Sequence, residues 1–139
     1  MKAGIIFWSQ TGNTEMMAEA IAEGVKAVGA EVEIMEVANA SVDAVLGFDV
    51  LALGCPAMGD EELEESEFEP MFTDCEGKLS GKRIALFGSY GWGDGEWMRT
   101  WEDTCRSAGA NLVCESVICM ESPDDEGEAS CRSLGAALA

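Results

Sequence analysis

The sequence predicts an α/β fold, with a doubly wound sheet of five parallel strands and helices on both faces. Apolar runs of strand length alternate with segments of helical periodicity five times along the chain. This alternation is typical of a parallel sheet that helices cover on both sides. Hydrophobic residues make up 47% of the 139 residues, which suits one well-packed interior. We therefore expect residues 1–139 to form a single domain.

The first third of the chain changes period twice. Residues 3–8 form a continuous apolar run, as a fully buried parallel strand requires. From Glu15 the apolar residues recur at helical spacing, and Gly29 ends this predicted helix. Residues 32–34 alternate like an edge strand with less cover, and Ser41 begins a short helix.

The middle of the chain repeats this pattern. Residues 50–54 predict a second buried strand, which Pro56 stops. A helix is expected near residues 68–75, and the next strand at residues 83–88.

The last third completes the five units. Trp97 and Trp101 are four residues apart, which favours one buried helix face, whereas Trp8 is left undecided between core and site. Residues 112–119 predict the last strand with a bend inside it. Ser122 is expected to cap the final helix, with Pro123 in its first turn.

Charge and composition exclude several classes of protein. The net charge of −19 lacks the basic surface of a nucleic-acid binder. The chain has no His, which removes the usual hydrolytic triads. Its six Cys form no C-x-x-C pair, so we expect no metal site and read them as reduced, mostly buried thiols of a cytoplasmic protein. No apolar run is long enough for a membrane span.

The acid is concentrated in one segment. Seven of the ten residues at positions 60–69 are Asp or Glu. No Lys or Arg occurs between positions 27 and 77. Such a run is either a solvated face or an acidic docking surface for a basic partner, since opposed fields steer encounter.

The loop after the first strand is rich in hydrogen-bonding groups. Backbone N–H groups at the start of the following helix favour an anion, and a Gly permits close approach of the backbone. The loop is either an ordinary capped turn or a phosphate site. It has no Lys and no G-x-G-x-x-G pattern, and its residues are Ser9, Gln10, Thr11, Gly12, Asn13 and Thr14.

Two further loops follow the strands at residues 50–54 and 83–88. The first of these loops consists of Pro56, Ala57, Met58, Gly59, Asp60 and Glu61. It contains a tight turn and a Met with no obvious partner, so it is either a plain surface turn or a surface on which a flat ligand packs. The second places a Trp between glycines, which favours stacking on a planar ligand over core packing: Ser89, Tyr90, Gly91, Trp92, Gly93, Asp94 and Gly95.

These three loops, in this order and context, resemble those of the flavodoxins of anaerobic bacteria. The resemblance covers the whole chain and indicates the short-chain type, because the fifth strand carries no long insertion. It implies the strand order 2-1-3-4-5 and one FMN at the carboxyl ends of the strands.

The resemblance also implies roles for individual residues. Ser9, Thr11, Asn13 and Thr14 would hold the phosphate, and Met58 and Trp92 would pack on the two faces of the flavin ring. Glu61 would accept a hydrogen bond from flavin N3–H, and residues 89–92 would contact the ribityl chain and the pyrimidine edge. The Gly59 carbonyl would turn toward N5–H in the neutral semiquinone. Pro56 departs from the family pattern, where many relatives have a hydroxyl, so no phosphate contact is assigned to it.

The function implied is low-potential transfer of single electrons, mainly between the neutral semiquinone and the anionic hydroquinone. The protein would be a monomeric carrier and not an enzyme. Its partners would be low-potential oxidoreductases of anaerobic metabolism with basic docking faces, such as pyruvate oxidoreductase, hydrogenase or nitrogenase reductase. The alternatives are an FMN-dependent reductase, a response-regulator-like signalling module and a redox-silent FMN-binding module. The signalling module would need acidic residues after the first and third strands, where the sequence has Trp8-Ser9 and Gly54-Cys55.

Overall fold

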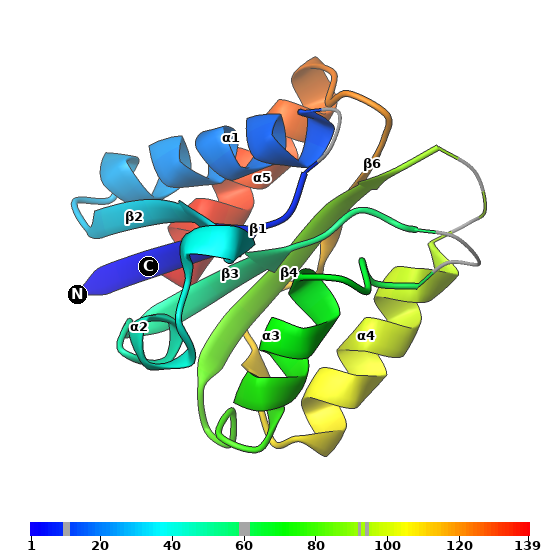
Figure 1. Cartoon of the computed structure of the whole chain (residues 1–139). Helices are drawn as coiled ribbons and strands as arrows, with labels where there is room; N and C mark the ends of the chain where they lie inside the picture. The colour runs from blue at the N-terminus through cyan, green and yellow to red at the C-terminus, as the bar shows by residue number, and fades with distance from the viewer. Residues whose placement is uncertain (10–11, 59–61, 92, 94) are drawn as a thin grey trace.

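A central sheet flanked by helices is the frame of the molecule (Figure 1). The structure is a computed structural model that describes residues 1–9, 12–58, 62–91, 93 and 95–139. Along the chain the elements are β1 (Lys2–Phe7), α1 (Asn13–Ala27), β2 (Glu31–Glu36), the 3-10 helix η1 (Val37–Asn39), α2 (Val42–Leu46), β3 (Val50–Gly54), α3 (Phe68–Glu76), β4 (Arg83–Tyr90), α4 (Glu96–Ser107), β5 (Asn111–Leu112), β6 (Val117–Met120) and α5 (Asp125–Leu138).

The strands pair in parallel in the order β2-β1-β3-β4-β5, and β6 also pairs with β4. This order confirms the predicted 2-1-3-4-5 arrangement. The fifth position is occupied by two pieces: β5 pairs with the start of β4, and β6 pairs with its end. The bend predicted within residues 112–119 is therefore a real interruption of the strand.

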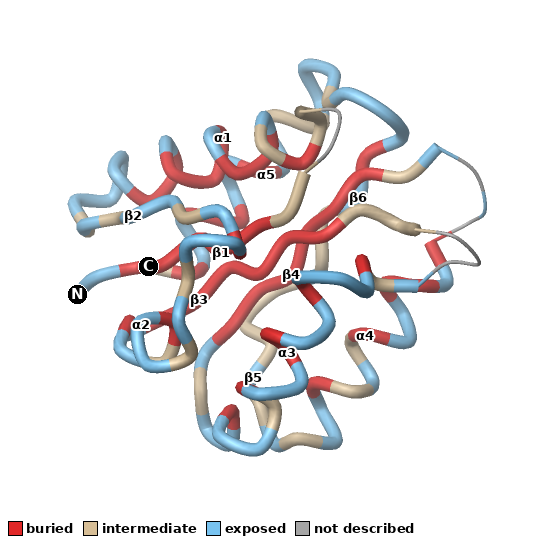
Figure 2. Tube along the Cα trace, in the orientation of Figure 1, coloured by how far each residue is buried: buried red, intermediate tan, exposed pale blue. Residues whose placement is uncertain are grey.

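Each face of the sheet carries its own apolar core. Side chains alternate across the sheet, so Ile5 packs toward α1 and α5 while Ile6 packs toward α3 and α4. Figure 2 shows β1, β3 and β4 buried over most of their length, with β2 largely exposed at the edge. No helix among the described residues is both long and apolar enough to cross a membrane.

Three boundaries differ from the predicted ones. Helix α1 begins at Asn13, two residues before Glu15. Strand β4 continues through Tyr90 because β6 provides a partner for its last residues. The predicted cap of the final helix is wrong: Asp124 is the N-cap, and its carboxylate accepts a hydrogen bond from Gly127 N at 2.7 Å. The cap predicted for α2 is confirmed, since Ser41 Oγ accepts from Ala44 N at 3.1 Å.

Helices α1 and α5 cross at glycines. A Cβ at Gly135 would lie 2.1 Å from the carbonyl oxygen of Ile21, and a Cβ at Gly24 would lie 2.0 Å from that of Arg132. These neighbours are backbone atoms, which cannot turn aside as a side chain could. The two helices can therefore pack this closely only because both positions lack a side chain.

All six cysteines are free thiols, and five of them are buried, while Cys114 is half-buried. The prediction that the thiols are mostly buried is therefore confirmed. Burial raises the pKa of both Cys55 and Cys105 to about 12, because the low-dielectric interior disfavours a thiolate. These two thiols remain protonated and inert at neutral pH.

We expect Gly135→Ala to lower the free energy of unfolding by about 2 kcal/mol, because the added methyl forces α5 away from α1. Gly77→Ala is the matched control. Gly77 has an ordinary helical φ of −68°, and nothing lies within 4 Å of its virtual Cβ. Urea unfolding followed by circular dichroism measures both, and equal stability of the two variants would contradict the close helix crossing.

We expect the native protein to react with dithiobisnitrobenzoate slowly and chiefly at Cys114, since the other thiols are buried. In guanidinium chloride all six thiols should react at once. Absorbance of the released thiolate, with mass spectrometry to locate the label, measures this. Rapid labelling of Cys55 or Cys105 in the folded protein would show that these two thiols are accessible and not buried.

Candidate functional site

A cleft opens at the carboxyl ends of the central strands. Its volume is about 470 Å³, within the range of roughly 300–1,000 Å³ typical of small-molecule sites. Parts of all three predicted loops line it, together with the residues after β6. The lining residues are Asn13, Pro56, Ala57, Met58, Ser89, Tyr90, Gly91, Glu121 and Ser122.

The first loop leads from β1 into the start of α1. Ser9 Oγ accepts a hydrogen bond from Gly12 N at 3.0 Å, and Gly12 takes a φ of 90° that only Gly adopts easily. The N-cap residue Gly12 has no side chain that could accept from the first N–H groups of α1. Its N–H groups, next to Asn13 on the cleft wall, favour an anion.

A buried hydrogen bond joins the first loop to the third. Thr14 Oγ1 lies 3.1 Å from Ser89 Oγ, and both residues are buried. One hydroxyl donates and the other accepts, so this bond leaves one hydroxyl proton for a further acceptor. The bond holds the start of α1 against the end of β4.

The second loop is tied to its neighbours through its backbone. Ala57 N donates to Ser89 O at 3.0 Å, and Met58 and Glu62 exchange two hydrogen bonds of 2.9 and 2.8 Å. This antiparallel bridge closes the loop and leaves the Met58 side chain half-buried on the cleft wall. The Met58 side chain, for which the sequence suggests no packing partner, thus presents an apolar surface to the cleft.

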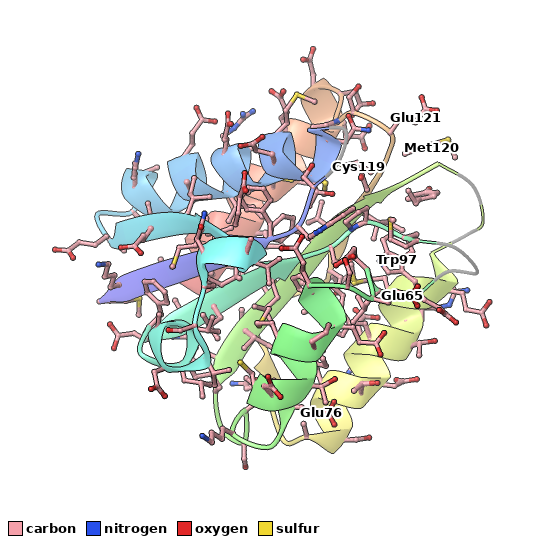
Figure 3. The ribbon with its side chains drawn as sticks, in the orientation of Figure 1. Glu65, Glu76, Trp97, Cys119, Met120 and Glu121 are labelled. Carbon is pink, nitrogen blue, oxygen red and sulfur yellow. The ribbon has the colours of Figure 1, made fainter. Side chains whose placement is uncertain are left out.

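The third loop rests on an aromatic support. Tyr90 packs on Trp97 with ring centroids 5.6 Å apart. Trp97 is 1% exposed, which confirms its prediction as a core residue, and its Nε1 donates to Cys55 O at 3.2 Å. Figure 3 labels Trp97 at the start of α4, beneath this end of the sheet. The tryptophan left undecided, Trp8, is half-buried, and its Nε1 donates to Glu67 Oε1 at 3.2 Å.

Several predicted site residues line the cleft, and others do not. Asn13, Ala57, Met58, Ser89, Tyr90 and Gly91 line it, whereas Ser9, Gly12, Thr14 and Gly93 do not. The predictions for Gln10, Thr11, Gly59, Asp60, Glu61 and Trp92 fall on positions outside the described residues.

Sequence reasoning missed two residues of the wall, Glu121 and Ser122. Glu121 follows β6, has a φ of 57°, and donates its N–H to Tyr90 O at 2.7 Å. It is labelled beside Met120 in Figure 3, at the end of that strand. The signal that could have found it is topological, since every strand of a parallel sheet ends at the same edge.

The donors and apolar groups of the cleft fit a planar ligand with an anionic tail. The start of α1 offers N–H groups and an amide for the anion, while Met58, Tyr90 and Gly91 offer flat apolar surface. FMN has both parts, a phosphate and an isoalloxazine ring. No Lys or Arg lines the described wall, so the phosphate would be held by hydrogen bonds alone.

Comparison with known proteins gives the same result. The family model described as flavodoxin matches residues 5–135. The chain is 48% identical to the flavodoxin of Clostridium beijerinckii over 135 residues, or 97% of each chain. It is 50% identical to the flavodoxin of Megasphaera elsdenii over 97% of this chain and 96% of that protein.

The fold is also similar to that of a solved flavodoxin. The solution structure of two-electron reduced Megasphaera elsdenii flavodoxin superposes with a TM-score of 0.90 and covers 98% of this chain and 97% of that one. The family model, the sequence identity over nearly the whole chain and the fold all point to the same family. The chain therefore belongs to the flavodoxin family, whose members are FMN-binding electron carriers and not enzymes.

Proposed function

We propose that this flavodoxin is a low-potential carrier of single electrons, with its FMN cycling mainly between the neutral semiquinone and the anionic hydroquinone. FMN supplies the one-electron chemistry when it is bound. The observation that carries the proposal is the charge of the cleft: Glu121 is on the described wall, no Lys or Arg is, and the chain has a net charge of −19.

The low potential follows from electrostatics. The final reduction adds negative charge to a site that already contains a phosphate and nearby carboxylates. Each close like charge costs on the order of 1 kcal/mol or more, depending on the local dielectric. For a one-electron couple, a tenfold change in equilibrium constant corresponds to about 59 mV. The surroundings therefore lower the potential of this step.

We propose the following contacts with FMN. Thr14 and its neighbours at the start of α1 hold the phosphate, Met58 packs on one face of the ring, and the end of β4 contacts the ribityl chain and pyrimidine edge. Asn13, Met58 and the end of β4 support this by their place on the cleft wall. Thr14 is buried next to Asn13, and its hydroxyl bonds to Ser89 of that wall. Among the other positions, Thr11 would join the phosphate contacts, Trp92 would cover the second ring face, Glu61 would accept from N3–H, and Gly59 would face N5.

The partner is proposed to be a redox protein with a basic docking face. Glu62, Glu65 and Glu67 are exposed between β3 and α3, and Glu69 is exposed in the first turn of α3. These carboxylates support electrostatic steering of such a partner. Free, buried thiols support a reducing, cytoplasmic location. The large apolar side chains exposed on the described surface form no large cluster, since only Ile118 and Met120 share a strand, which supports a monomer.

The test of the function is stepwise anaerobic reduction of the FMN-loaded protein with dithionite, followed by its visible spectrum. We expect a blue neutral semiquinone to accumulate and then bleach, with the second potential below that of free FMN. A second potential equal to that of free FMN would contradict a low-potential carrier. A protein that takes up no FMN would contradict the whole proposal.

The phosphate contact of Thr14 is tested by comparing FMN with riboflavin, which lacks the phosphate. We expect Thr14→Val to weaken FMN binding about tenfold, or 1.4 kcal/mol, and to leave riboflavin binding unchanged. Thr104→Val is the matched control, because the Thr104 hydroxyl donates to Thr100 O within α4 at 3.0 Å, and Thr104 is not on the described cleft wall. Fluorescence titration of FMN and of riboflavin measures both dissociation constants for the wild type and the two variants. Equal losses for FMN and riboflavin would show that Thr14 supports Ser89 and does not contact phosphate.

A further inference from the structure

One carboxylate of the acidic segment is buried. Glu64 is 5% exposed, although Glu62, Glu65, Glu67 and Glu69 around it are all exposed. Burying a charged group is costly unless hydrogen bonds compensate for it. The surroundings of Glu64 therefore differ in kind from the solvated carboxylates beside it.

The Glu64 carboxylate is enclosed by donors from the turn that leads into α3 and from the first residue of that helix. Its oxygens accept from the backbone N–H groups of Ser66 at 2.9 Å, Glu67 at 2.7 Å and Phe68 at 2.9 Å. The Ser66 hydroxyl donates to it as well. Glu64 thereby satisfies N–H groups that the start of a helix leaves without partners.

These bonds favour the ionised carboxylate. Burial acts to raise the pKa of Glu64, but the hydrogen bonds from Ser66, Phe68 and Glu67 outweigh it, and the pKa lies below its usual value. The negative charge also meets the positive end of the α3 helix dipole.

The backbone of Glu64 is anchored too. Its N–H donates to Cys55 Sγ at 3.3 Å, and its carbonyl accepts from Glu69 N at 2.8 Å. Cys55 is fully buried at the end of β3, where its N–H donates to Phe87 O at 3.2 Å and its carbonyl accepts from Trp97 Nε1. Cys55 therefore holds Glu64 to the end of the sheet.

This arrangement closes a loop. The chain leaves the sheet at Cys55 and returns to the Cys55 side chain at Glu64. Between these points lie Ala57 and Met58 on the cleft wall, and the Met58–Glu62 bridge lies inside the loop. The two ends of the cleft loop are thus fixed by the same buried contact, and α3 begins directly after it.

We infer that Glu64 is a positioning residue of the FMN site. Its carboxylate, by capping α3, fixes residues 62 and 63, and through the Met58–Glu62 bridge it sets the position of Met58 against the flavin. The inference rests on the proposed function, because it concerns the same cleft. Glu64 is not among the residues that line the described cleft wall.

The isosteric change Glu64→Gln tests this. The amide keeps the shape but replaces one acceptor oxygen by an NH₂ group that faces N–H donors. Glu65→Gln is the matched control, since it removes the same charge one residue away on an exposed side chain, which is labelled in Figure 3. Both variants therefore change the electrostatics of the acidic segment alike, and only the first disturbs the cap.

We expect Glu64→Gln to raise the dissociation constant of FMN about tenfold and Glu65→Gln to raise it less than twofold. We also expect Glu64→Gln to shift the first reduction potential relative to Glu65→Gln. A threefold change in the ratio of affinities for oxidised and reduced flavin corresponds to about 28 mV. Potentiometry gives a readout that a general loss of stability would not move.

Ser66→Ala keeps the charge and removes only the hydroxyl donor, so it decides the question if Glu64→Gln fails to fold. We expect it to raise the FMN dissociation constant about threefold in protein that urea unfolding shows to be folded without FMN. Wild-type protein that binds FMN, with equal constants and potentials in Glu64→Gln and Glu65→Gln, would overturn this inference and leave the proposed function intact. Wild-type protein that binds no FMN would overturn both.

Discussion

Helices cover both faces of the sheet, and this constraint decides where polar chemistry can occur in the molecule. β1, β3 and β4 are buried over nearly their whole length, so a hydrogen-bonding ligand has no place along them. Because the strands are parallel, their carboxyl ends meet at one edge, and the loops that follow them are the first exposed backbone. The cleft is built there from segments that are far apart in the sequence.

The end of β3 connects this edge to the rest of the protein. Cys55 is a small apolar residue with a weak acceptor sulfur, and it contacts β4, α4 and the segment before α3 through hydrogen bonds. β4 passes so near its carbonyl that a Cβ at Gly88 would lie 2.2 Å from it. The described parts of the cleft loops thus rest on a buried cluster and not on the surface alone.

Much of this could be predicted from the sequence, because periodicity reports burial directly. The apolar runs identified the buried strands, and the spacing of Trp97 and Trp101 identified the inner face of α4. The composition of three loops located the candidate site, and three stretches of its described wall come from them.

The errors arose where tertiary contacts decide between similar local choices. Ser122 and Asp124 are both good caps, and only the folded chain selects Asp124. The strand character of Ser89 and Tyr90 depends on pairing with β6. Glu64 looks like its neighbours in sequence, and its burial follows from the position of Cys55.

The two edges of the sheet also bear on the behaviour of the protein at high concentration. An exposed edge strand offers unpaired N–H and C=O groups to a second molecule and can seed aggregation. At one edge, β2 is lined by the exposed carboxylates of Glu31, Glu33 and Glu36. At the other, the interruption between β5 and β6 leaves only two short pieces of two and four residues. One edge repels a second copy by its charge, and the other offers too short a strand for a second copy to pair with, so an open sheet need not lead to aggregation.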